Sequence, residues 1–202
     1  MSVCDPITGM HTLFSTAITK QVFTNKPDIS YSDIWEQPSF NSFQTLKKGF
    51  LSSQFPWFYN PYVLTKEGDH PDEDDQSYQF TNLLYRQNHG PQSEGYNYII
   101  PILQKLDTPN VIIRAKINLN PRDTEHTMLG GYHVDHPFNN AKTAIYYVNT
   151  NNGWTEFETG EVIPSVENRI VIFDSKIKHV GYSCTDEKTR VVLNINYLPL
   201  NS

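Results

Sequence analysis

The stretch Val111-Ile112-Ile113-Arg114-Ala115-Lys116-Ile117-Asn118-Leu119 shows the alternation that decides the fold class of this chain. Its apolar residues at 113, 115, 117 and 119 fall on one face of an extended segment. Arg114, Lys116 and Asn118 fall on the other face. This period of two predicts a β-strand over 111–119 with one polar and one apolar side.

Four further segments downstream have the composition of strands, and Gly-, Asn- and Asp-containing turn sequences separate them. These segments are Thr143–Val148, Trp154–Phe157, Ile170–Phe173 and Thr189–Leu198. Short strands at this spacing, with no long helices between them, predict an antiparallel sandwich or barrel. We expect a mainly β fold with N-terminal helices and a double-stranded β-helix core, of the jelly-roll or cupin-like type.

The N-terminal half is expected to support that core from outside. We expect one domain over 1–202, in which 1–110 form the support layer and 111–202 form the core with the site. Apolar residues at helical spacing predict helices around 40–50, at 79–88 and at 95–106. The aromatic run 55–59 is expected to pack this layer onto a sheet, and a substrate-facing aromatic wall is the alternative.

Composition and charge exclude several classes of function. No run of about 18 apolar residues exists, so no membrane span is expected. The N-terminus resembles no secretion signal, and Cys4 and Cys184 form no disulfide framework, so we expect reduced cysteines and a cytoplasmic protein. The net charge of −6 comes from six acidic residues within 67–75, which we expect to form a solvated loop, with a mobile lid as the alternative. The remaining charges balance, so nucleic acid is not an expected partner.

The segment Gly131-Tyr132-His133-Val134-Asp135 carries a candidate metal site. In an extended segment the residues at positions i and i+2 point to the same side, so His133 and Asp135 can bind one ion. A second pair of this kind, His70-Pro71-Asp72, lies in the acidic stretch and has no predicted sheet around it. We therefore reject it as a metal site.

His179 and Arg190 complete the pattern. His179 follows the predicted strand 170–173 after a short turn and is the expected third ligand. Two histidines and one carboxylate on one face are typical of non-haem Fe(II) oxygenases, although zinc accepts the same ligands. Arg190 begins the strand 189–198, which we expect beside the strand that ends at His179. Its guanidinium group can bind a carboxylate through two hydrogen bonds. A zinc hydrolase does not need such a guanidinium group beside its metal.

The stretch from Arg114 to Tyr197 resembles the 2-oxoglutarate- and Fe(II)-dependent dioxygenase superfamily, in its prolyl 4-hydroxylase-like branch. The residues that carry the resemblance are His133, Asp135, His179 and Arg190, together with the segments 143–149 and 167–174. The sequences of these segments most resemble those of small stand-alone oxygenases of marine phages. This resemblance would place the protein in the host cytoplasm. Val192 departs from the pattern, since many relatives carry Ser or Thr there in contact with the co-substrate.

The resemblance implies a site and a reaction. His133, Asp135 and His179 would hold Fe(II), and Arg190 would bind the C5 carboxylate of 2-oxoglutarate. Lys116 and Asn118 are candidates for the polar contact that Val192 cannot make. Tyr146 and Asn194 are candidates for the substrate pocket, and no catalytic residue is expected beyond the metal ligands.

The implied reaction consumes 2-oxoglutarate and O₂, with ascorbate as a candidate reductant, and forms succinate, CO₂ and a hydroxylated product. A peptidyl or free amino-acid side chain is the favoured substrate, and a small metabolite or a nucleobase is compatible with the same core. Two alternatives stay open: a non-catalytic metal-binding jelly-roll protein of cupin type, and a zinc-dependent hydrolase. Arg190 is the residue that argues against both.

Overall fold

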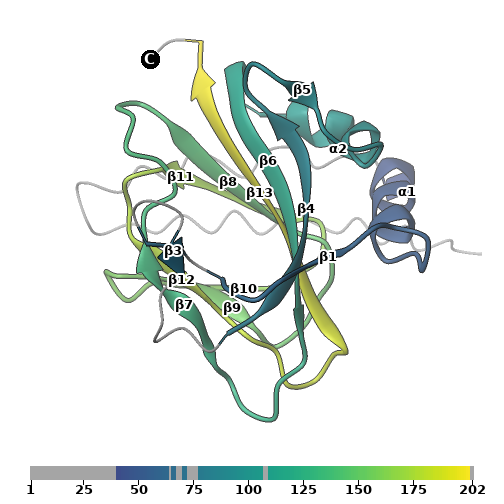
Figure 1. The fold of residues 1–202 in the computed structure, drawn as a ribbon, viewed down its shortest axis with the longest axis vertical. Helices are drawn as coiled ribbons and strands as arrows, with labels where there is room; N and C mark the ends of the chain where they lie inside the picture. The colour runs from purple at the N-terminus through teal and green to yellow at the C-terminus, as the bar shows by residue number, and fades with distance from the viewer. Residues whose placement is uncertain (1–39, 64, 67–69, 72–76, 107–108, 201–202) are drawn as a thin grey trace, which may run out of the picture.

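Two antiparallel β-sheets lie face to face and make up most of the molecule (Figure 1). The structure is a computed structural model and describes residues 40–63, 65–66, 70–71, 77–106 and 109–200. Cys4 and most of the acidic stretch 67–75 lie outside these residues. Cys184 is a buried free cysteine.

The larger sheet has seven strands, and six of them form a continuous path. In spatial order these are β1 (Phe58–Asn60), β4 (Gln79–Arg86), β6 (Pro109–Pro121), β13 (Thr189–Pro199), β8 (Lys142–Tyr147) and β11 (Arg169–Asp174), and β5 (Gly90–Pro91) pairs with β4. The smaller sheet has the order β10 (Val162–Pro164), β9 (Trp154–Phe157), β12 (His179–Tyr182) and β7 (Met128–His133). A short hairpin joins β2 (Thr65–Lys66) to β3 (His70–Pro71).

From β6 onward the chain passes back and forth between the two sheets. β6, β8, β11 and β13 belong to the larger sheet, and β7, β9, β10 and β12 belong to the smaller one. This alternation of antiparallel strands between two facing sheets is the jelly-roll arrangement. The predicted double-stranded β-helix core is therefore confirmed, and the five predicted strands appear within two residues of their expected ends.

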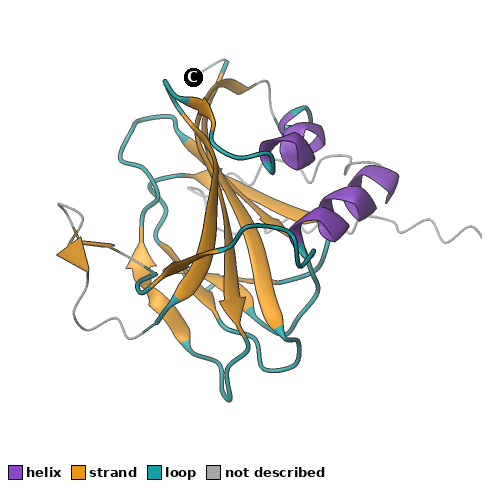
Figure 2. Cartoon of the chain, turned by 45° about the vertical axis from the view of Figure 1, so that its right-hand side comes forward, coloured by secondary structure: helices purple, strands orange, loops and turns teal. Residues whose placement is uncertain are grey.

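Both helices cover one face of the larger sheet (Figure 2). α1 (Phe40–Phe50) buries Phe43, Leu46 and Phe50, which recur at helical spacing, and α2 (Tyr96–Leu103) buries Ile99, Ile102 and Leu103. Neither helix in the described part of the chain has the length and apolar character that a membrane span requires.

The side chains of the core form two clusters, one on each face of the larger sheet. The first lies between this sheet and the helices, and includes Leu84, Ile117 and Leu193. Phe55 and Trp57 pack against its edge, as the packing interpretation of the aromatic run expects. The second cluster lies between the two sheets and includes Tyr147, Phe157 and Phe173. It fills one part of the space between the sheets and leaves the rest to the site.

The predicted helix at 79–88 is wrong, because these residues form strand β4. Phe80, Leu83 and Leu84 have the i, i+3, i+4 spacing of a helix. The register against β6 shifts between Leu83 and Tyr85, and a β-bulge of this kind interrupts the alternation that would have revealed the strand. Long-range pairing with β1 and β6 therefore overrides the local pattern.

Candidate metal and anion site

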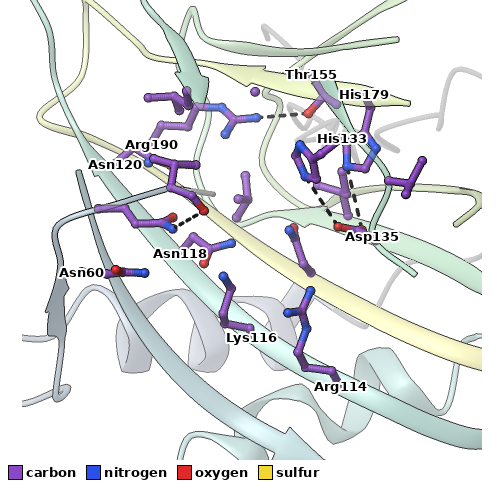
Figure 3. Close-up of a pocket in the computed structure, with 18 residues that line it drawn as sticks. Asn60, Arg114, Lys116, Asn118, Asn120, His133, Asp135, Thr155, His179 and Arg190 are labelled. Atoms are coloured by element: carbon purple, nitrogen blue, oxygen red, sulfur yellow. Dashed lines mark hydrogen bonds and ion pairs between the residues drawn. The ribbon is translucent and has the colours of Figure 1, made fainter. Parts of the chain in front are cut away.

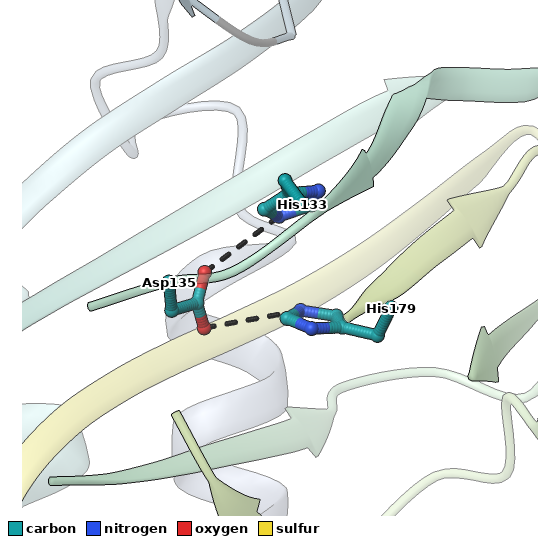
Figure 4. Close-up of side chains that lie close together, drawn as sticks. All are labelled: His133, Asp135 and His179. Carbon is teal, nitrogen blue, oxygen red and sulfur yellow. Dashed lines mark ion pairs between the residues drawn. The ribbon is translucent and has the colours of Figure 1, made fainter. Parts of the chain in front are cut away.

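His133, Asp135 and His179 converge at one end of the smaller sheet (Figure 4). His133 ends β7, His179 begins β12, and the two residues pair directly across these strands. The Nε2 atom of His133 lies 3.6 Å from Oδ1 of Asp135, and Nε2 of His179 lies 3.8 Å from Oδ2. The three candidate ligand atoms all lie within 4.8 Å of one another, which is close enough to surround one metal ion.

Backbone carbonyl groups orient both imidazole rings. Nδ1 of His133 lies 2.9 Å from the carbonyl oxygen of Gly131, and Nδ1 of His179 lies 3.1 Å from that of Ile177. A carbonyl oxygen can accept a hydrogen bond from Nδ1 only when that nitrogen carries the proton. In the neutral tautomer with the proton on Nδ1, each ring presents the lone pair of Nε2 towards Asp135, which is the form that binds a metal.

Asn196 of β13 holds the carboxylate from the opposite sheet. Its Nδ2 donates to Oδ2 of Asp135 at 3.2 Å and to Oγ1 of Thr143 at 3.0 Å. Its Oδ1 accepts a hydrogen bond from Nε of Arg114 at 3.3 Å. Asn196 is fully buried, so its amide cannot exchange these partners for water. The carboxylate is thereby fixed in place before any metal binds.

The protonation states of the buried ligands suit a cation. Burial would raise the pKa of Asp135, but the interactions of its carboxylate with His133, His179 and Arg114 hold it well below its usual range. Burial lowers the pKa of His179, although Asp135 opposes that shift. At neutral pH the structure therefore offers one carboxylate and a neutral buried imidazole from His179.

A cavity of about 390 Å³ opens between the sheets beside the triad (Figure 3). Its walls are mostly polar. They include Arg114, Lys116, Asn118 and Asn120 from β6, and Arg190 and Asn194 from β13. The polar face of the alternating strand 111–119 thus points into the cavity, while Ala115 and Ile117 point into the helix-covered core.

Arg190 extends from β13 towards the smaller sheet. This corrects the expected placement of its strand: β13 pairs with β6 and β8 of the larger sheet, and His179 lies on the facing sheet, at the start of β12 rather than the end of a strand. Its side chain crosses the space between the sheets. Nε donates to Oγ of Ser165 at 3.0 Å, and Nη2 donates to Oγ1 of Thr155 at 3.1 Å and to the carbonyl of Trp154.

Arg190 is a buried cation, and the described part of the chain places no carboxylate against it. Its exposed fraction is 3%, and no carboxylate of the described residues forms an ion pair with it. Burial lowers its pKa, but a guanidinium group keeps its charge at neutral pH. A buried charge without a counterion is costly, so this environment favours an anionic ligand.

Small residues leave room around this guanidinium group. A Cβ atom on Gly153 would lie 2.8 Å from Cδ of Arg190, and one on Gly181 would lie 3.4 Å from its Nη1. Larger side chains at these two positions would therefore compete with Arg190 or with whatever it binds.

The other residues singled out from the sequence have mixed placements. Lys116, Asn118 and Asn194 line the cavity. Tyr146 does not, which corrects the prediction for it: it lies in the core beneath the helices, where its hydroxyl donates to Oδ1 of Asn168 at 2.7 Å. Its neighbour Tyr147 faces the space between the sheets and donates to Oγ1 of Thr155 at 2.9 Å.

Three residues of the site were not predicted from the sequence: Arg114, Asn120 and Thr155. Arg114 and Asn120 lie on the same polar face as Lys116 and Asn118, so the alternation contained the signal for both. Asn196 shares a face with Arg190, but its contact with Asp135 depends on how the two sheets stack. Thr155 has no local signal, because only the position of β9 brings it to the guanidinium group.

The chain and its fold can be compared with those of known proteins. No protein-family model and no curated protein sequence matches the chain. Solved structures do match. One is a non-heme α-ketoglutarate-dependent carbocyclase, SnoK, from nogalamycin biosynthesis, with a TM-score of 0.57 and 12% identity over 85% of this chain and 80% of that one. α-Ketoglutarate is another name for 2-oxoglutarate.

Two further structures agree with it. An oxidoreductase of the 2OG-Fe(II) oxygenase family from Burkholderia pseudomallei matches with a TM-score of 0.53 and 14% identity over 78% of each chain. A prolyl hydroxylase from Trichoplax adhaerens, solved with a peptide fragment of hypoxia inducible factor, matches with a TM-score of 0.50 and 12% identity over 78% of this chain and 77% of that one. The fold is that of the 2-oxoglutarate- and Fe(II)-dependent oxygenases. At these identities the likeness establishes the oxygenase fold, and the chemistry must be argued from the site.

Proposed function

We propose that this chain is an Fe(II)- and 2-oxoglutarate-dependent oxygenase that hydroxylates an amino-acid side chain, free or in a peptide. The reaction would consume 2-oxoglutarate and O₂ and form succinate and CO₂. One observation carries the proposal: Arg190, a buried cation with no acidic partner among the described residues, shares a cavity with a triad of metal-binding groups. The oxygenase fold supports it independently.

The triad fits a redox-active divalent metal. Two imidazole nitrogens and one carboxylate oxygen are ligands that Fe(II) accepts, and all three lie within 4.8 Å of one another. The cavity beside them leaves room for further ligands. His133, Asp135 and His179 would hold the ion, and bound Fe(II) would supply the oxygen-activating chemistry.

The distance between the triad and Arg190 fits a short dicarboxylate. Gly181, beside the guanidinium group, lies two residues after His179 on the same strand, which corresponds to roughly 6.6 Å. 2-Oxoglutarate has one carboxylate and a keto oxygen at one end and a second carboxylate at the other. We propose that the first end binds beside the triad and that the C5 carboxylate pairs with Arg190.

The remaining walls would position this molecule and keep water out. Thr155 and Ser165 hold the guanidinium group in place. Asn118 of β6 pairs with Val192 of β13, two residues after Arg190, and Lys116 pairs with Asn194, two residues further on. We therefore propose Asn118 and Lys116 as contacts to the co-substrate. The rings of Phe157 and Phe173 pack near His179 and shield its side of the site.

The test is formation of succinate from 2-oxoglutarate under air with added Fe(II). We expect slow turnover by the wild type even without its substrate, and none by His179→Ala. Arg190→Ala should need about a hundredfold more 2-oxoglutarate, because it loses a buried charge pair. Arg122→Ala is the matched control, since Arg122 is exposed and lies just beyond the end of β6. Absence of both succinate and 2-oxoglutarate binding in the iron-loaded wild type would favour a metal-bearing scaffold instead.

A further inference from the structure

Strand β6 places two more cations in the cavity besides Arg190. Arg114 and Lys116 occupy successive positions on its polar face and extend towards the level of the triad (Figure 3). They lie opposite Asn196 and Asn194 of β13, further from Arg190 than Asn118 and Asn120 are. Their side chains therefore belong to the metal end of the cavity, whereas Arg190 belongs to the other end.

Neither cation has an acidic partner among the described residues. Arg114 uses Nε for Asn196, and its two terminal nitrogens form no hydrogen bond with a described residue. The ammonium group of Lys116 forms none either. Burial lowers the pKa of Lys116 to about 8, and the positive charge of Arg114 contributes a smaller part of this shift. The negative charge of Asp135 opposes it. Asp135 is the one acidic side chain among the described residues that line this cavity, and it faces the two histidines.

If Fe(II) and 2-oxoglutarate occupy the proposed site, they do not neutralise the charges of Arg114 and Lys116. The charges of Fe(II) and Arg190 are balanced by those of Asp135 and the two carboxylates of 2-oxoglutarate. Arg114 and Lys116 then remain as two positive charges on half-buried side chains that line the cavity. Even if Lys116 also contacts the co-substrate, no carboxylate among the described residues forms an ion pair with Arg114. The environment favours a second anionic ligand.

We infer that the primary substrate is a small acid whose carboxylate or phosphate group binds to Arg114 and Lys116. This inference rests on the proposed function for the identity of the first ligand. The guanidinium group of Arg114 reaches Asp135 through a single residue, Asn196, so the acidic group would lie only a few bonds from the oxidised carbon. A cavity of about 390 Å³ is at the small end of ligand sites, which suits a free acid beside the co-substrate.

Asn194 adds a polar contact to this subsite. Its Oδ1 is buried, faces the cavity from between Arg190 and Asn196 on β13, and has no hydrogen-bond partner among the described residues. A buried acceptor of this kind favours a ligand that carries a donor. A hydroxyl or amino group close to the acidic group would satisfy it, so a free hydroxy acid or amino acid fits best.

The test is a sequential calorimetric titration of the Mn(II)-loaded protein. 2-Oxoglutarate is added to saturation first, followed by acetate, inorganic phosphate or acetamide, the neutral analogue of acetate. We expect at least one anion to bind and acetamide not to bind. Arg114→Gln should weaken anion binding about tenfold or more, because the charged hydrogen bonds are lost. Lys116→Gln should weaken it too, and Arg114→Lys should retain part of it.

Arg122→Gln is the matched control and should bind the anion as the wild type does. Binding of acetate alone would identify a carboxylate as the acidic group, and binding of phosphate alone would identify a phosphate. The inference is overturned if no anion binds to the wild type, if acetamide binds equally well, or if Arg114→Gln binds the anion unchanged. Failure of the first titration, with 2-oxoglutarate, would instead contradict the proposed function. Variants that still take up Mn(II) are folded at the site.

Discussion

At the level of single residues, Gly181 leaves room for a ligand beside the guanidinium group of Arg190, because it has no side chain. Gly181 faces Nη1 of Arg190, and even a Cβ atom there would be at 3.4 Å. Gly181→Val should therefore raise the 2-oxoglutarate concentration needed for half-maximal succinate formation by about tenfold or more, because the branched side chain occupies the place of the C5 carboxylate. Gly131→Ala is the control, since a Cβ atom there meets no other atom within 4 Å. Equal kinetics for the two variants would contradict the proposed position of the carboxylate.

Asn196 is a residue that should act on the metal rather than on the co-substrate. Removing its amide by Asn196→Leu leaves Asp135 without its donor from β13. Loss of such a supporting contact typically reduces metal affinity about 10- to 100-fold. Asn194→Leu, two residues away on the same face, should leave metal affinity close to that of the wild type. Titration of the metal-free proteins with Fe(II) under nitrogen measures both. An unchanged affinity in Asn196→Leu would show that Asp135 needs no such support.

His179 should make the stability of the metal-free protein depend on pH. Burial holds its pKa below the ordinary value of about 6.5, so the unfolded chain takes up a proton below that pH while the folded chain does not. Stability should therefore fall as the pH drops below about 6.5. Urea unfolding in the presence of a chelator at pH 7.5 and 5.5 measures this loss. It should be smaller in His179→Gln, which cannot take up the proton. An equal loss in both proteins would assign the effect to other groups.

At the level of elements, α1 stabilises the fold by covering the larger sheet. Leu46 is 1% exposed in the core between the helices and this sheet, so Leu46→Ala should lower the free energy of unfolding by about 2–4 kcal/mol. Leu51→Ala is the control, because Leu51 is 42% exposed just after the helix and should change stability by about 0.5 kcal/mol or less. Urea denaturation measures both changes. A small loss in Leu46→Ala would mean that α1 is dispensable for the core.

Elements that show a clear period could be predicted from the sequence, and those that depend on distant partners could not. The alternation in β6 and the helical spacing in α1 depend only on neighbouring residues. In β4 a bulge hides the period of two, and pairing with β1 and β6 decides the structure. The position of β13 in the sheet opposite His179 is likewise a property of the whole topology.

The site shows the same division between local and long-range information. His133 and Asp135 are two residues apart in the sequence, and His179 follows a predicted strand, so all three could be named as candidate ligands. The opposite orientations of Tyr146 and Tyr147 were predictable. Which of the two faces the space between the sheets was not, because that depends on the side of the strand that the helices cover.

At the level of the whole molecule, each of the two sheets supplies a different set of side chains to the site. The smaller sheet presents the two histidines, and the larger sheet presents the cations and asparagines that face them (Figure 3). The helices pack on the opposite side of the larger sheet and take no part in the cavity walls. The stacking of the sheets therefore sets the distance between the His133–Asp135–His179 triad and Arg190, and with it the length of the co-substrate that would fit the proposed site.

The most direct measurement compares two ligands that differ only at the far end. The Mn(II)-loaded wild type and Arg190→Ala are each titrated with 2-oxoglutarate and with 2-oxobutyrate, which lacks the second carboxylate. The wild type should prefer 2-oxoglutarate by about a hundredfold, because the buried charge pair forms only with that ligand, and Arg190→Ala should lose most of this preference. The same preference in both proteins would contradict the proposal that Arg190 binds the co-substrate.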